Sequence, residues 1–121
     1  MKAAVPAEGR AVLYRVADGT ATITLNRPEV LNAINGAMHR GILEGLERAA
    51  GDDTVRVVVI RGSGRAFSAG GDLKAVAAGE DVGHPKALGR AIWTLAKPVA
   101  ANKRLVNEQY ERAGFLASTE S

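Results

Sequence analysis

The sequence has 121 residues, of which 46% are hydrophobic and 4% aromatic, a composition that suits one small domain with a mainly aliphatic core. It contains no cysteine, which excludes disulfides and cysteine-based metal sites and is compatible with a reducing compartment. The formal net charge is +3, but the basic residues are scattered, so we predict no nucleic-acid partner. The start has no signal-peptide core and no apolar run approaches membrane-spanning length, so we predict a cytoplasmic protein with no membrane span.

The first elements in chain order are a loose arm and a β-hairpin. Residues 1–10 are predicted to be a flexible N-terminal arm. Apolar residues then alternate over two segments, at Val12, Tyr14 and Val16 and again at Ala21, Ile23 and Leu25. Asp18-Gly19 between these segments is a turn signal, so the pattern predicts a hairpin. Pro28 ends the second strand, because proline has no N–H to donate.

An amphipathic helix is predicted next, within the stretch "NAINGAMHRGILEGLERAA". Its apolar residues fall at helical spacing on one face, at Ile34, Met38, Ile42, Leu46 and Ala49. Asn35 is a suitable N-cap and Gly51 a suitable C-terminal stop. His39 falls among the polar residues, on the side predicted to stay in water.

The second half of the chain begins with a buried strand. Residues 55–61, "VRVVVIR", are a nearly continuous β-branched run of the kind found in parallel strands covered on both faces, so strand, helix and strand predict a βαβ crossover. The remaining predicted elements are a short helix over 72–78, a loop over 79–84, a second helix over 85–95, a strand begun by "KPVAA", and a last helix with a frayed tail over 102–121. Trp93 is predicted to pack in the core. The fold class is therefore α/β, a β-hairpin plus βαβ with covering helices.

The glycine loop, residues 62–71, follows the buried strand. Its "GSG" resembles the start of a dinucleotide fingerprint, but Phe67 stands where a third small residue would be needed. The later piece, "SAGGDLK", keeps side chains out of the way, so backbone N–H groups are free to bind a carbonyl oxygen as negative charge builds on it. The alternative is that the glycines only turn the chain and Asp72 caps the next helix. The residues alone leave both interpretations open.

Three segments together resemble the enoyl-CoA hydratase/isomerase family, also called the crotonase family. They are "ATITLNRPEVLNAI", "VRVVVIRGSGRAFSAGGDLK" and "LAKPVAA", and their order and spacing also fit. The resemblance covers residues 11–101, which would be the N-terminal half of a truncated crotonase-like unit. It implies an enzyme that acts on acyl-CoA thioesters by stabilising an enolate in an oxyanion hole, with coenzyme A as part of the substrate and no separate cofactor or metal.

Site residues are implied by the same resemblance, position by position. The N–H of Gly71 would be one of two oxyanion-hole donors. Ala69 and Ala33 stand where backbone carbonyls meet the adenine ring, and Gly70 lies in the same coenzyme-binding loop. Lys74 stands where a basic side chain often lies near the phosphates of coenzyme A, although an ordinary exposed lysine is an equal alternative.

The sequence departs from the family pattern after "KPVAA". Family members continue into an A-V-N-G segment, with the second oxyanion donor and the catalytic glutamates there and beyond, whereas this chain continues as "NKRLVNEQYERAGF". Hydration, isomerisation and thioester hydrolysis all remain open as reactions. The alternative function is a non-catalytic protein that binds coenzyme A or acyl-CoA, or that pairs with a complete subunit. Losing the middle would expose apolar sheet surface, so a homo-oligomer is expected.

Overall fold

A four-stranded mixed sheet organises the chain. The computed structural model describes residues 10–102, so the predicted N-terminal arm and last helix lie almost entirely outside the described residues. The strands are β1 (Val12–Ala17), β2 (Thr20–Leu25), β3 (Val57–Gly62) and β4 (Val99–Asn102), in the order β1-β2-β3-β4. β1 pairs antiparallel with β2, while β2, β3 and β4 run parallel. The predicted hairpin and parallel crossover are both confirmed.

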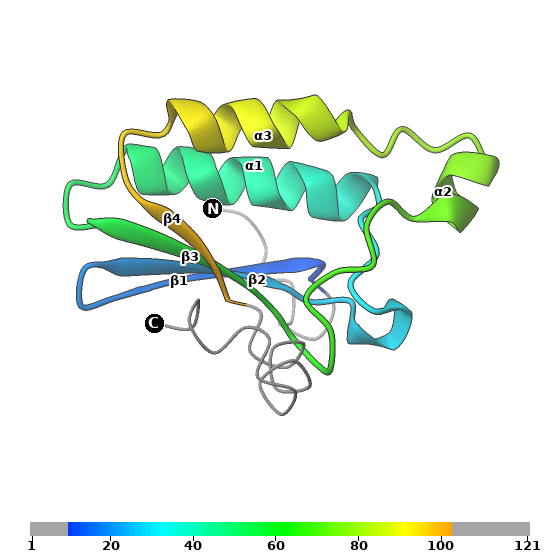
Figure 1. The fold of residues 1–121 in the computed structure, drawn as a ribbon, viewed down its shortest axis with the longest axis horizontal. Helices are drawn as coiled ribbons and strands as arrows, with labels where there is room; N and C mark the ends of the chain where they lie inside the picture. Colours follow the sequence, from blue (N-terminus) through cyan, green and yellow to red (C-terminus); the bar gives the residue numbers. More distant parts are fainter. Residues whose placement is uncertain (1–9, 103–121) are drawn as a thin grey trace, which may run out of the picture.

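The helices that cover this sheet lie on one of its faces (Figure 1). The described helices are α1 (Gly36–Ala50), α2 (Leu73–Ala77) and α3 (Pro85–Thr94), with one 3-10 turn at Pro28–Val30. α1 and α3 run side by side over the sheet, whereas α2 lies off its end, beyond the glycine loop (Figure 1). The α/β class predicted from the sequence is therefore confirmed.

The hairpin turn and the start of α1 are determined by residues close together in the sequence. Asp18 and Gly19 both have positive φ, at 53° and 79°, which is what a tight hairpin turn requires. Asn35 caps α1, because its side chain accepts a hydrogen bond from the Met38 N–H at 3.0 Å. Gly51 ends the helix as predicted.

The core lies between the sheet and α1. Its buried apolar residues come mainly from β2, β3 and α1, and they are Ala21, Ile23, Leu25, Met38, Ile42, Leu46, Ala49, Val55, Val58 and Ile60. A Cβ on Gly45 would lie 3.0 Å from the Ile23 Cδ1 atom, so the glycine is what allows α1 to approach β2 this closely.

Two placements predicted from the sequence are wrong. Trp93 is 88% exposed, because Leu88 and Ile92 on α3 turn toward the core and the residue after Ile92 points outward. His39 is buried rather than wet, because Gly83 packs against its ring and its Nε2 lies 3.2 Å from the His84 carbonyl oxygen. A loop that returns across α1 therefore covers a position that helical periodicity places in water.

The contrast between Ile23 and Trp93 gives a stability prediction. Ile23→Ala removes a fully buried side chain and should lower the free energy of unfolding by about 2–5 kcal/mol. Trp93→Ala should change it by no more than about 0.5 kcal/mol, since the indole is exposed. Urea unfolding followed by circular dichroism measures both. A large loss for Trp93→Ala would contradict the orientation of α3 described above.

Candidate functional site

A short backbone pairing brings the glycine loop against the segment that precedes α1. The Ala69 N–H donates to the Leu31 carbonyl at 2.9 Å. The Ile34 N–H donates to the Gly70 carbonyl at 2.7 Å, and the Asp72 N–H donates to the Ile34 carbonyl at 2.9 Å. Ile34 and Gly71 thus form an isolated parallel bridge, which aligns two segments far apart in the sequence.

This pairing decides where the Gly71 amide points. Because the Gly70 carbonyl and the Asp72 N–H both bond to Ile34, the alternation of an extended backbone turns the Gly71 N–H to the opposite side. Gly71 is exposed, and a Cβ at this position would meet no atom within 4 Å. Within residues 10–102, no acceptor is hydrogen-bonded to its N–H. The amide is therefore open to an incoming oxygen.

Asn32 is the polar centre that holds the surrounding loops together. Its side chain is fully buried and its φ is 56°. It accepts from the Arg27 N–H at 2.8 Å and donates to the carbonyls of Ser63 and Ala66, each at 2.9 Å. The Ser68 hydroxyl completes the connection by donating to the Asn32 carbonyl at 2.8 Å. Every polar atom of this buried amide is thus used to join the glycine loop to the end of β2.

An ion pair lies directly beside the bridge. Arg27 Nη1 is 3.0 Å from Asp72 Oδ2 and also donates to the Ala33 carbonyl at 2.6 Å. The other oxygen, Asp72 Oδ1, accepts from the Ala75 N–H at 3.1 Å and so caps α2. The Ala75 hydrogen bond and, next, that of Arg27 lower the pKa of Asp72 below its ordinary value.

The residues implied by the family resemblance lie as follows. Gly70 and Gly71 belong to the bridge, and Gly70 has a φ of 93° that favours glycine. Gly70 donates its own N–H to the Ser68 hydroxyl oxygen at 3.0 Å, so its amide is engaged. Ala69 is exposed beside them, and Lys74 is exposed on α2. The bridge therefore gathers the glycines and Ala69 on one edge, and Lys74 follows in the first turn of α2.

Both interpretations of the glycine loop that the residues left open have support. Asp72 does cap α2, which is the structural alternative. The Gly71 amide is nevertheless left open, which the functional interpretation requires. Ala33 differs from expectation in one respect, because its carbonyl already accepts from Arg27. Arg27 was not singled out by sequence reasoning, and its place in the "LNRP" segment was the available signal.

The loop over residues 79–84 is held against α1. Glu80 Oε2 accepts from the Gly36 N–H at 2.8 Å, at the first residue of α1. The His84 ring nitrogen Nδ1 accepts from the Lys86 N–H at 3.1 Å at the start of α3. These side chains therefore serve helix starts. Among residues 10–102, no group of three or more His, Cys, Asp or Glu is placed to hold a metal ion, and no helix there is long and apolar enough to cross a membrane.

Comparison with known proteins identifies the class to which this fold and site belong. A family model described as enoyl-CoA hydratase/isomerase matches residues 20–114. The trans-2-decenoyl-[acyl-carrier-protein] isomerase of Streptococcus mutans is 40% identical over 94 residues, which are 78% of this chain and 36% of that protein. The 1,2-epoxyphenylacetyl-CoA isomerase of Escherichia coli is 47% identical over 62 residues, 51% of this chain and 24% of that protein.

Solved structures agree with the sequence comparison. The crystal structure of an enoyl-CoA hydratase/isomerase from Xanthobacter autotrophicus matches with a TM-score of 0.70 at 36% identity, covering 78% of this chain and 38% of that chain. The chain belongs to the enoyl-CoA hydratase/isomerase family and has a crotonase-like fold, as its motifs predicted. It spans less than two fifths of the length of each of these three relatives.

The Asp72 contacts predict a pH-dependent contribution to stability. Since the folded-state pKa lies below the ordinary value of 3.8, the carboxylate contributes stability that is full above that value and is lost as the pH falls below it. The difference in free energy of unfolding between wild type and Asp72→Asn should therefore be full at about pH 6 and smaller at about pH 3. Urea unfolding at both pH values measures this difference. Asp53→Asn, at an exposed carboxylate, monitors general acid effects, and a pH-independent difference for Asp72→Asn would contradict the contacts.

Proposed function

We propose that the chain binds acyl-CoA thioesters and holds the thioester carbonyl oxygen on the Gly71 N–H. The observation that carries this proposal is the open, exposed amide at Gly71, whose direction is set by the bridge to Ile34. When water adds to an enoyl thioester, or when a proton leaves its carbon chain, electrons move onto that oxygen and form an enolate. A fixed N–H aimed at the oxygen stabilises this charge more than it stabilises the neutral ground state.

The carrier of the acyl group in this proposal is coenzyme A. The exposed Ala69 carbonyl would accept from the adenine amino group, and the Lys74 ammonium would lie near the phosphates. The name of the Escherichia coli relative specifies a CoA thioester, and that of the Streptococcus mutans relative an acyl-carrier-protein thioester. What these names share is the thioester, which is the group that Gly71 would contact. Fatty-acyl metabolism in the cytoplasm is the proposed setting, and a cysteine-free chain fits a reducing compartment.

A second candidate function, binding without turnover, is favoured by the carboxylates next to the site. Asp72 is engaged by Ala75 and Arg27, and Glu80 by the Gly36 N–H. Both carboxylates already accept hydrogen bonds from within the protein, which favours binding without proton transfer. Calorimetric titration with coenzyme A and a hydration assay with crotonyl-CoA separate the two functions. Binding with hydration supports the enzyme, binding alone supports the second candidate, and no binding rejects both.

Replacing Gly71 by proline tests the amide directly, because proline removes the N–H. Circular dichroism of the variant shows whether the fold is kept. We expect Gly71→Pro to lower hydration by about 10²–10³-fold if the chain is active, since this is the usual effect of deleting one oxyanion donor. Gly71→Ala is the matched control, because it keeps the N–H and its Cβ meets no protein atom. Equal activity of the proline variant and the alanine variant would remove the amide from the mechanism.

We further propose that the chain self-associates through the sheet face opposite α1. Arg15, Thr22 and Val59 lie in register on this face. Leu13 lies on the same face, two residues before Arg15 on β1, and the helices described in residues 10–102 lie on the other face (Figure 1). Leu13 and Val59 are half-buried in the single chain. This face also carries polar residues such as Thr22 and Arg15, but the apolar area of Leu13 and Val59 would be stabilised if a second copy covered it.

Analytical ultracentrifugation tests this assembly. We expect species larger than the monomer at high protein concentration, and a shift toward monomer in Val59→Lys, since a lysine would bring a charge into the contact. Val76→Lys makes the same substitution at an exposed position of α2, away from this face, and should leave the association unchanged. A monomer at all concentrations would contradict the proposal.

A further inference from the structure

One side chain contacts both of the segments that the bridge aligns. Arg27 follows β2, and its Nη1 atom reaches the Ala33 carbonyl at 2.6 Å on one segment and Asp72 Oδ2 at 3.0 Å on the other. Its side chain is 19% exposed, so the contacts are partly shielded from water. Ala33 and Asp72 are the immediate neighbours of Ile34 and Gly71, the two residues of the bridge. Arg27 therefore fastens this bridge from one side.

The amide of Gly71 needs such a restraint. It lies in a pair of adjacent glycines, the least restricted residues of the backbone, and no side chain of its own packs against the protein. Gly70 is fixed at its N–H by Ser68 and at its carbonyl by Ile34. On the other side of Gly71, the fixed points are the Asp72 N–H, which bonds to Ile34, and the Asp72 carboxylate.

We infer that Arg27 is a positioning residue, which acts through Asp72 to aim the Gly71 N–H at the substrate oxygen; the inference rests on the proposed function of that amide. Arg27 suits this role because a planar guanidinium offers several N–H donors in a rigid arrangement. Its Nη1 already donates to two protein acceptors, the Ala33 carbonyl and Asp72 Oδ2, so this nitrogen joins two segments of the protein. A misplacement of about 1 Å at a catalytic group can cost about 100-fold in rate, so a restraint on direction matters even where the fold survives.

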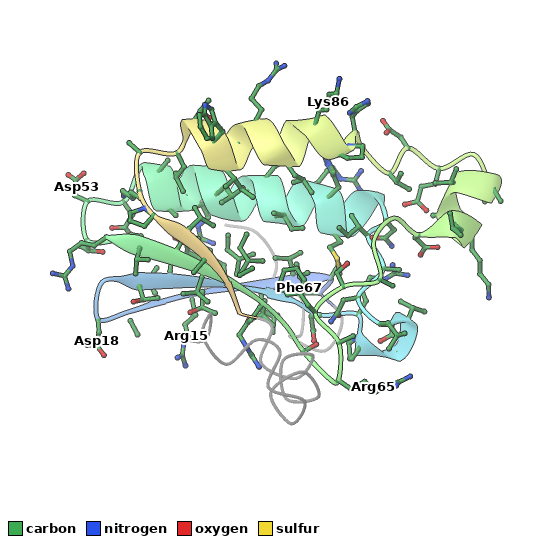
Figure 2. All side chains as sticks on the ribbon, in the orientation of Figure 1. Arg15, Asp18, Asp53, Arg65, Phe67 and Lys86 are labelled. Atoms are coloured by element: carbon green, nitrogen blue, oxygen red, sulfur yellow. The ribbon has the colours of Figure 1, made fainter. Side chains whose placement is uncertain are left out.

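The experiment compares two ligands on the same variants. Coenzyme A lacks the thioester carbonyl, whereas acetoacetyl-CoA forms an enolate whose negative charge is shared between the ketone oxygen and that thioester oxygen. We expect Arg27→Met to weaken acetoacetyl-CoA binding about 10- to 100-fold and coenzyme A binding by less than about 2-fold, as measured by calorimetry. Arg15→Met, an exposed arginine pointing away from the helices, is the matched control and should leave both affinities unchanged (Figure 2).

Further variants separate positioning from general stabilisation. Asp72→Asn keeps an oxygen for the Ala75 N–H but loses the ion pair, so it should reproduce the ligand-selective loss of Arg27→Met. The double variant Arg27→Met/Asp72→Asn should lose no more than either single variant, because both remove the same contact. Arg27→Lys should recover part of the affinity. Equal losses for both ligands, or additive losses in the double variant, would overturn the inference.

A spectroscopic measurement keeps the inference testable if wild type binds neither ligand, which would reject the proposed function itself. Arg27→Met and Asp72→Asn should then shift the Gly71 amide resonance in ¹H–¹⁵N spectra, whereas Arg15→Met should not. Urea unfolding of each variant shows that the fold is retained. An unmoved Gly71 resonance in both variants would overturn the positioning role.

Discussion

The site depends on the register of one backbone bridge. Ile34 uses its N–H and its carbonyl to hold the residues on either side of Gly71, and this choice sends the Gly71 amide outward. In extended pairing, a shift of one residue reverses which groups face the partner. With such a shift, Gly71 would bond to Ile34 and its amide would be consumed. The openness of this amide is therefore a consequence of pairing register, and glycine composition alone does not produce it.

Asn32 is what makes that register stable. Leu31 and Asn32 both hold left-handed backbone conformations, with φ of 54° and 56°, which cost about 1–2 kcal/mol for residues with side chains. The buried side-chain amide offsets this strain through its hydrogen bonds to Arg27, Ser63 and Ala66. The same bonds bring the glycine loop to the end of β2. The hydrogen bonds of the Asn32 side chain thus both offset the strain at Leu31 and Asn32 and align the glycine loop.

Patterns within one element were predictable from the sequence, and contacts between distant elements were not. The hairpin and the Asn35 cap of α1 follow from residues a few positions apart. His39 could not be placed, because Gly83 covers it from a loop that helical periodicity does not describe. Trp93 follows Ile92 by one residue, about 100° around the helix, so a core-facing stripe on α3 sends it outward. The sequence alone does not say which apolar residue of α3 faces the core.

In the candidate site, too, local patterns were predictable from the sequence and contacts between distant residues were not. The family resemblance pointed to Gly71 through a local run of small residues, and its role as an oxyanion donor stays a prediction. The ion pair between Arg27 and Asp72 joins positions 45 residues apart, and no pattern along the chain marks it. The three-dimensional arrangement makes Asp72 a scaffold residue that serves Arg27 and the Ala75 amide.

The hydrogen bonds around the candidate site distinguish two chemical tasks, stabilising charge on a carbonyl oxygen and transferring a proton. In the proposed function, Gly71 would donate to the thioester oxygen, whereas Asp72 accepts from the Ala75 N–H and Arg27, and Glu80 accepts from the Gly36 N–H. The hydrogen bond from the Ala75 N–H and, next, that from Arg27 lower the pKa of Asp72, so this carboxylate stays charged at neutral pH. Under the proposed function, the part of the chain described here would polarise a bound thioester without itself supplying the proton. Affinity for an enolate and turnover of an enoyl thioester are thus separate properties, and the open Gly71 amide bears only on the first.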